Sequence, residues 1–84
     1  MRNVKDPISW GGNLDDDCIA YWAQLVLRAE SMGADQWWWA VIDDKNDGLE
    51  IASSNKNDQI CRDGVAARAA AEKAARKYLE WNKL

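Results

Sequence analysis

The segment DDKNDGLEI, residues 43–51, gathers the carboxylates and the glycine from which calcium-binding loops are built. With Gly48 at the glycine position of such a loop, Lys45 falls on a ligand position, and Ser54 stands where a bidentate glutamate is required. An ammonium group cannot coordinate a cation, and the strongest ligand is missing. The segment is therefore not expected to hold a metal ion.

A second acidic group, Asp15, Asp16 and Asp17, follows Asn13 closely. Consecutive carboxylates on a helix fan out over different faces and do not converge on a metal. In the first turn of a helix, however, their charges complement the positive end of the helix dipole. This interpretation predicts a helix capped by Asn13, with the three aspartates exposed and able to contact a basic partner.

The residues of enzyme active sites are scarce in this chain. It has no histidine, and its two cysteines, Cys18 and Cys61, have no base partner visible in the sequence. Histidine is the usual general base and the commonest metal ligand. Gly11 and Gly12 are not followed by the pattern of a phosphate-binding loop. The sequence therefore predicts a protein that is not an enzyme and has no catalytic residue, no metal and no cofactor.

The start of the chain, MRNVKDPISWGG, has no apolar leader, and no run approaches the roughly 20 apolar residues of a membrane span. We therefore expect a cytoplasmic protein without membrane contact. In that compartment Cys18 and Cys61 are expected to stay reduced, as small buried hydrophobic residues.

The elements that position these residues are predicted from apolar spacing. A helix is predicted over residues 14–32, ending before Gly33, because one apolar stripe recurs every three or four residues. The stripe is Cys18, Trp22, Leu25, Ala29 and Met32. The alanine-rich C-terminal segment predicts a second helix that Asp63 can cap. Its stripe is Ala67, Ala71, Ala74, Tyr78 and Trp81.

Between the helices, WWWAVID and LEIASSN are rich in strand-forming residues and flank the turn residues DDKNDG. They predict a β-hairpin. The expected fold class is α+β, a single α-β-β-α domain over residues 13–84. Both helices pack on one face of a short antiparallel hairpin. Residues 1–12 are expected to form an irregular arm or a short strand.

The hairpin register decides which tryptophans face the helices. A three-residue loop at 46–48 puts Trp37, Trp39, Val41, Leu49 and Ile51 on one face, and glycine at the third loop position favours this register. A four-residue loop would instead join Trp38, Ala40 and Ile42 to Leu49 and Ile51.

In the favoured register, Trp38, Ile42 and Ala52 lie on the face that the two helices leave open. The candidates for covering this face are the chain's own arm with Val4, Ile8 and Trp10, a second copy, or a different partner. The candidate partner-binding residues are therefore Trp38, Ile42, Ala52, Asp15, Asp16 and Asp17.

The predicted function is protein binding by a small acidic protein of the inhibitor, immunity or regulatory type, as found in bacteria and phages. The net charge is −3, with the acidic residues concentrated before residue 61. One alternative is a structural homodimer with a tryptophan-rich interface. Another is binding of single-stranded nucleic acid by the basic helix that carries Arg68, Lys73, Arg76 and Lys77. The acidic balance makes nucleic acid an unlikely partner.

Overall fold

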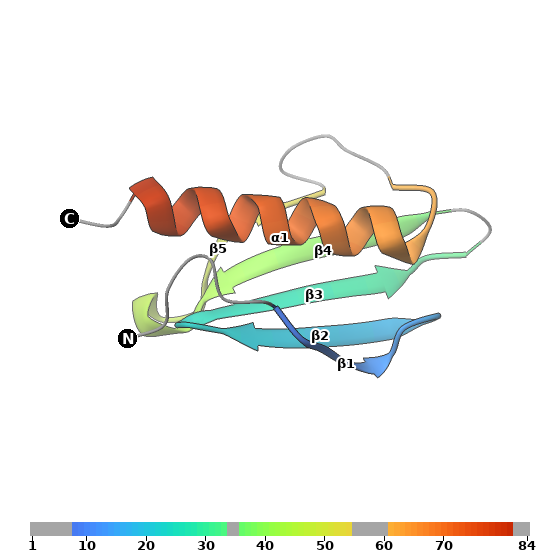
Figure 1. Cartoon of the computed structure of the whole chain (residues 1–84), viewed down its shortest axis with the longest axis horizontal. Coiled ribbons are helices and arrows are strands. Elements are labelled where there is room, and N and C mark those ends of the chain that lie inside the picture. Colours follow the sequence, from blue (N-terminus) through green and yellow to red (C-terminus); the bar gives the residue numbers. More distant parts are fainter. Residues whose placement is uncertain (1–7, 34–35, 55–60, 82–84) are drawn as a thin grey trace.

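The computed structural model describes residues 8–33, 36–54 and 61–81. Five strands form one antiparallel sheet in chain order, and one helix packs on it (Figure 1). The strands are β1 (Trp10–Asn13), β2 (Asp17–Trp22), β3 (Leu25–Ser31), β4 (Trp37–Asp43) and β5 (Leu49–Ser53). A short 3-10 helix, η1 (Asp44–Asn46), joins β4 to β5, and the helix is α1 (Gly64–Trp81). The predicted α-β-β-α order is therefore wrong, although the α+β class is retained.

The predicted helix over residues 14–32 is wrong, because this segment forms the β2–β3 hairpin. Its connection has two residues, Ala23 and Gln24, so the buried positions are even-numbered in β2 and odd-numbered in β3. Cys18, Trp22, Leu25 and Ala29 are all buried in consequence. When the buried positions change from even to odd numbers across a two-residue turn, their spacing along the sequence thus matches that of an apolar helical stripe.

Two further residues distinguish the hairpin from a helix. Ala20 and Leu27 are also buried, at 1% and 0% exposure, as alternation along strands requires. Met32, the last residue of the supposed stripe, is 64% exposed. The aspartates lie in a turn and a strand, so they do not form the first turn of a helix as predicted. Asn13 caps that turn by accepting a hydrogen bond from the amide of Asp15 at 3.0 Å.

The β2–β3 turn places Ala23 at φ 54°, a left-handed conformation that favours glycine. Type II′ hairpin turns place glycine at this first central position. We expect Ala23→Gly to stabilise the fold by about 0.5–1 kcal/mol, measured by urea unfolding. The matched control is Ala69→Gly on the exposed side of α1, where the same change should cost about 1 kcal/mol. A loss of stability in both variants would contradict the turn geometry.

The predicted hairpin is present as β4–β5, but its register is only partly as predicted. Near the turn, Asp43 pairs with Leu49 and Ile42 with Glu50, so like parities meet. The register then shifts between Val41 and Ile42, and Val41 pairs with Ala52. Ile51 is the extra residue of this β-bulge. Ala52, at 8% exposure, therefore replaces Ile51 beside Val41 on the core face.

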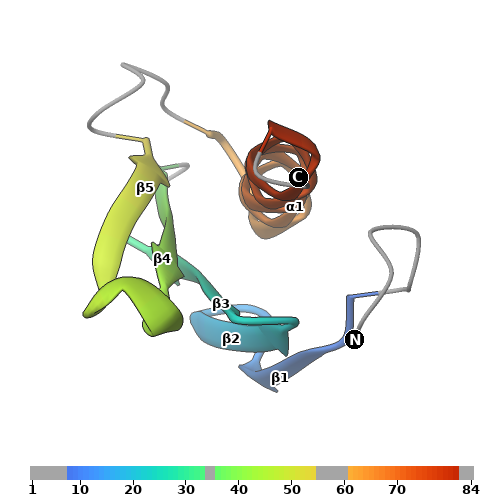
Figure 2. The same cartoon turned by 90° about the vertical axis from the view of Figure 1, so that its left-hand side faces the viewer.

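The helix α1 begins where the sequence predicts. Asp63 accepts a hydrogen bond from the amide of Ala66 at 2.7 Å. Ala67, Ala71 and Ala75 are fully buried against the sheet, and their small side chains let the helix approach it closely. Figure 2 shows the sheet bending around α1, so that the helix lies on the concave side. The side chains of Trp22, Leu27, Trp39 and Val41 fill the space between the two layers.

Residues at the start of the described chain also join the core. Ile8 and Trp10 pack against it, and the indole of Trp10 donates a hydrogen bond to Glu72 of α1 at 2.9 Å. Because Trp10 pairs with Ala20, its side chain lies on the same side of the sheet as α1. This part of the predicted arm thus covers the helix side, and Val4 lies outside the described residues. The cysteines are free, as predicted, and Cys18 is buried.

Candidate functional site

The side of the sheet turned away from α1, which we call the outer face, is the candidate site. Strand alternation and register place two sets of side chains there. The apolar set, called the outer patch, is Ile19, Tyr21, Val26, Trp38 and Ile42. The polar set is Asp17, Arg28, Glu30, Glu50 and Ser53. Ala40 lies between the two sets and is fully buried.

The outer patch remains partly exposed. Tyr21 pairs with Val26, which pairs in turn with Ile42, so three apolar side chains form a row across β2, β3 and β4. Tyr21 is 69% exposed, and the other members of the outer patch are half-buried. None of them belongs to the core cluster or packs against it. Ala40 and Ser53 are buried on the same side, so the outer patch with its flanking charges is the accessible part of the outer face among the described residues.

Carboxylates flank the outer patch. Asp17, Glu30 and Trp38 form one row across β2, β3 and β4, so the carboxylate of Glu30 lies beside the indole and that of Asp17 lies one strand further away. The guanidinium of Arg28 is 3.6 Å from the carboxylate of Asp17 and 3.8 Å from that of Glu30. The side chains of Asp17 and Glu30 are 52% and 44% exposed, so these ion pairs are well solvated.

The structure brings together only some of the predicted site residues. Trp38 and Ile42 share the outer face, and Asp17 joins them as the first residue of β2. Asp15 and Asp16 are exposed in the turn between β1 and β2. Ala52 does not share this face, because the bulge turns it toward α1, where it is buried.

Sequence reasoning missed three of the five members of the outer patch. Ile19, Tyr21 and Val26 lie on β2 and β3, within the segment assigned to a helix. The continuous apolar run from Cys18 to Trp22, which includes the strand-forming residues Ile19, Tyr21 and Trp22, is the signal that a strand assignment would have used.

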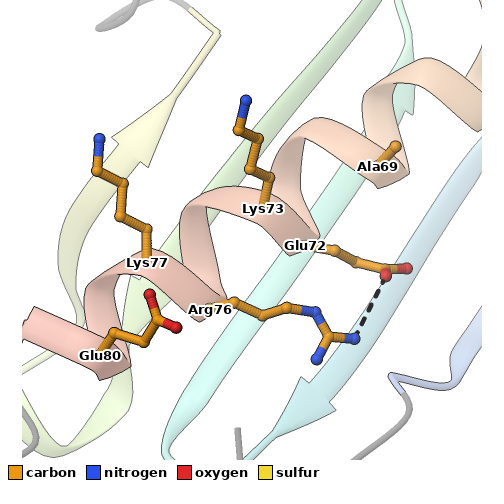
Figure 3. Close-up of a pocket in the computed structure, with 6 residues that line it drawn as sticks. All are labelled: Ala69, Glu72, Lys73, Arg76, Lys77 and Glu80. Carbon is orange, nitrogen blue, oxygen red and sulfur yellow. Dashed lines mark ion pairs between the residues drawn. The ribbon is translucent and has the colours of Figure 1, made fainter. Parts of the chain in front are cut away.

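A charged hollow of about 670 Å³ lies along the exposed side of α1. Its lining residues are Ala69, Glu72, Lys73, Arg76, Lys77 and Glu80 (Figure 3). Glu72 and Arg76 reach to one side of the helix and form an ion pair at 3.8 Å. The guanidinium of Arg76 also lies 5.2 Å from the ring centre of Trp22. Glu72 and Arg76 thus help to fasten α1 to the sheet.

The cations of α1 differ in their surroundings. Arg68 donates hydrogen bonds to the carbonyl of Leu14 at 2.9 Å and to the thiol sulfur of Cys18 at 3.8 Å. Arg76 is engaged as described above, whereas Lys73 and Lys77 point away from Glu72 and Arg76 (Figure 3). Two of the four cations considered for nucleic-acid binding are therefore committed to contacts within the chain.

A buried carboxylate lies at the end of β4. Asp43 is 2% exposed and accepts hydrogen bonds from the Tyr78 hydroxyl at 2.6 Å and the Gln24 amide at 3.1 Å. The amide of Lys45 donates a further one at 3.0 Å. Burial by itself raises the pKa of Asp43, but these hydrogen bonds outweigh it and leave the pKa below its ordinary value. The group is thus an ionised anchor that ties α1 to the sheet.

One cysteine of the described chain also has a shifted pKa. Burial, and then the nearby carboxylate of Asp63, raise the pKa of the Cys61 thiol, which makes it a poor nucleophile at neutral pH. Within residues 8–33, 36–54 and 61–81, no three acidic or cysteine side chains gather as a metal site would require. In the same residues no helix is long and apolar enough to cross a membrane.

The architecture defines this chain as a small α+β domain, a five-stranded antiparallel meander with a C-terminal helix on its concave side. No family model matches the sequence, and no characterised protein or solved structure shows significant similarity to it.

Proposed function

We propose that this protein is a binding module that acts without catalysis and contacts a protein partner through its outer face. The observation that carries the proposal is the unequal cover of the two sides of the sheet. The only α-helix among the described residues lies on the concave side. The outer patch keeps two aromatic and three aliphatic side chains partly exposed on the opposite side.

Physical reasons connect such a face to binding. Contiguous exposed apolar side chains on a small domain usually mark an interaction surface. Tryptophan and tyrosine are enriched among the residues that dominate binding energy, because they bury a large area with few rotatable bonds. Trp38 and Tyr21 supply both types, and the strands hold them rigidly. The contacts that hold the sheet to α1, including those of the buried Asp43, do not involve these two side chains.

Trp38→Ala tests this proposal. We expect the variant to keep nearly all of its unfolding free energy, because Trp38 is outside the core cluster. It should weaken partner binding by about 2 kcal/mol or more, as loss of an interfacial tryptophan does. Unfolding in urea measures the first quantity. Affinity capture from the cells that make the protein, followed by titration of the captured partner, measures the second.

Val65→Ala is the matched control, because Val65 is 69% exposed on α1 and lies away from the outer face. It should leave both stability and binding unchanged. If Trp38→Ala unfolds the chain as severely as a core substitution, Trp38 is structural. If both variants bind like the unmodified protein, the outer face is not the contact surface.

A further inference from the structure

The charges around the outer patch restrict the kind of partner that fits it. Among the described residues, the outer face carries the carboxylates of Asp17, Glu30 and Glu50 and one cation, Arg28. The net charge of these four side chains is −2. Arg28 already lies near both Asp17 and Glu30, so it offsets part of their charge and has little left to offer a ligand. Further carboxylates, those of Asp15 and Asp16, are exposed in the adjoining turn.

This charge disfavours two of the possible occupants. A second copy placed face to face would bring two acidic surfaces together, and like charges opposed across an interface oppose association. A nucleic acid would bring phosphates to the same carboxylates. A partner with basic side chains is attracted electrostatically by every carboxylate that flanks the outer patch. Charge complementarity therefore selects a basic partner over both alternatives.

The shape of the outer face adds a second restriction. Because the sheet bends around α1, its outer side is convex (Figure 2). A flat, rigid surface touches a convex face over a small area only. The partner must then follow the curvature, as a flexible segment or a hollow surface can. Its apolar side chains would meet the row formed by Tyr21, Val26 and Ile42, and its cations would meet Asp17 and Glu30.

We propose that the outer face binds a basic, partly apolar polypeptide segment of another protein, in which lysine or arginine side chains alternate with aliphatic ones. This inference rests on the proposed function and specifies its partner. The indole of Trp38 stands at the end of the row that runs through Glu30 to Asp17, so it offers such a lysine or arginine an aromatic face next to the carboxylate of Glu30. The row is thus a recognition site for one cationic side chain.

The test is an NMR titration of the ¹⁵N-labelled full chain with two synthetic peptides, one of alternating lysine and leucine, the other of alternating glutamate and leucine. We expect the lysine peptide to shift the Trp38 indole and the amides of β2, β3 and β4, with little effect on α1. The glutamate peptide should bind at least tenfold more weakly. Raising the salt concentration should reduce this preference, because the carboxylates are exposed.

Two triple variants that change the net charge by the same amount make the test more specific. Asp17→Asn/Glu30→Gln/Glu50→Gln removes the carboxylates of the outer face. Asp44→Asn/Asp47→Asn/Glu80→Gln removes three that lie elsewhere. The first should lose about tenfold in affinity for the lysine peptide and gain affinity for the glutamate peptide. The second should keep the original preference. Equal effects of the two variants, or shifts concentrated on α1, would overturn the inference.

The outcomes separate this inference from the proposed function. If the peptides bind without regard to charge while Trp38→Ala still abolishes binding of the natural partner, the partner is apolar rather than basic, and only the inference fails. If sedimentation shows a dimer that Trp38→Ala dissociates, the occupant is a second copy, and the inference is likewise overturned. If Trp38 affects neither the peptides nor the natural partner, both proposals fail.

Discussion

Trp22→Ala is expected to destabilise the protein by about 3–5 kcal/mol, the largest effect of any single substitution considered for this chain. Trp22 is fully buried on β2, between the sheet and α1. Its removal leaves a large cavity, because the surrounding strands are paired on both sides and cannot collapse into it. It also takes away the ring beneath the guanidinium of Arg76. Urea unfolding followed by far-ultraviolet circular dichroism measures the loss.

A more conservative variant separates packing from polarity at this position. In the described part of the chain, the buried indole nitrogen of Trp22 has no hydrogen-bond acceptor. Trp22→Phe therefore gives up ring volume but no hydrogen bond, and it should cost less than Trp22→Ala. A loss below about 1 kcal/mol for Trp22→Ala would show that Trp22 lies outside the core.

Asp43→Ala is expected to cost about 2–3 kcal/mol, the second large effect, because partly buried donors would lose a charged acceptor. The hydroxyl of Tyr78 and the side-chain amide of Gln24 both point at this carboxylate. Asp44→Asn, on the exposed neighbour, should be nearly neutral and serves as the control. If Asp43→Ala is equally mild, the carboxylate does not hold α1 to the sheet.

The same network gives stability a defined pH dependence. The folded pKa of Asp43 lies below its ordinary value of 3.8, so its contribution is complete above that value and is lost as the pH falls through the folded pKa. The hydrogen bond to Asp43, followed by burial, raises the pKa of Tyr78 above its ordinary value of 10.0. The contribution of Tyr78 is therefore complete below pH 10.0 and is lost as the pH rises through its folded pKa.

Measurements of the unfolding free energy against pH test both the loss of stability at acid pH and the loss at alkaline pH. Asp43→Asn should remove the part of the stability loss at low pH that comes from Asp43. Tyr78→Phe should remove the part of the stability loss at high pH that comes from the Tyr78 hydroxyl. A Tyr78→Phe variant with the full alkaline loss would show that the Tyr78 hydroxyl does not titrate in contact with Asp43.

The sequence predicts α1 well because its signals are local. Asp63 supplies a cap, and alanines supply both helix propensity and a narrow apolar stripe. The β2–β3 hairpin could not be recognised in the same way. Its turn is Ala23-Gln24, which contains none of the usual turn residues, and the parity change across it imitates helical spacing. The pairing of β2 and β3 with each other, with β1 and with β4 outweighed the apparent helical periodicity.

The outer face shows the same limit. Trp38 and Ile42 alternate along β4 and could be placed on one side from sequence alone. Ala52 could not be placed, because a bulge after Glu50 leaves no mark in a segment where Ile51 and Ala52 are both apolar. Tyr21 and Val26 become neighbours of Ile42 only when the sheet forms. The convexity of the face is likewise a property of the whole sheet.

The most direct test of the outer face as a contact surface is photo-crosslinking in the cells that make the protein. The photoreactive residue benzoylphenylalanine replaces Tyr21, which is 69% exposed on the outer face, or Ala69, which is exposed on α1. We predict a discrete adduct with another protein from position 21 and none from position 69. An adduct from position 69 with none from position 21 would contradict the account and would place the contact surface on the helix.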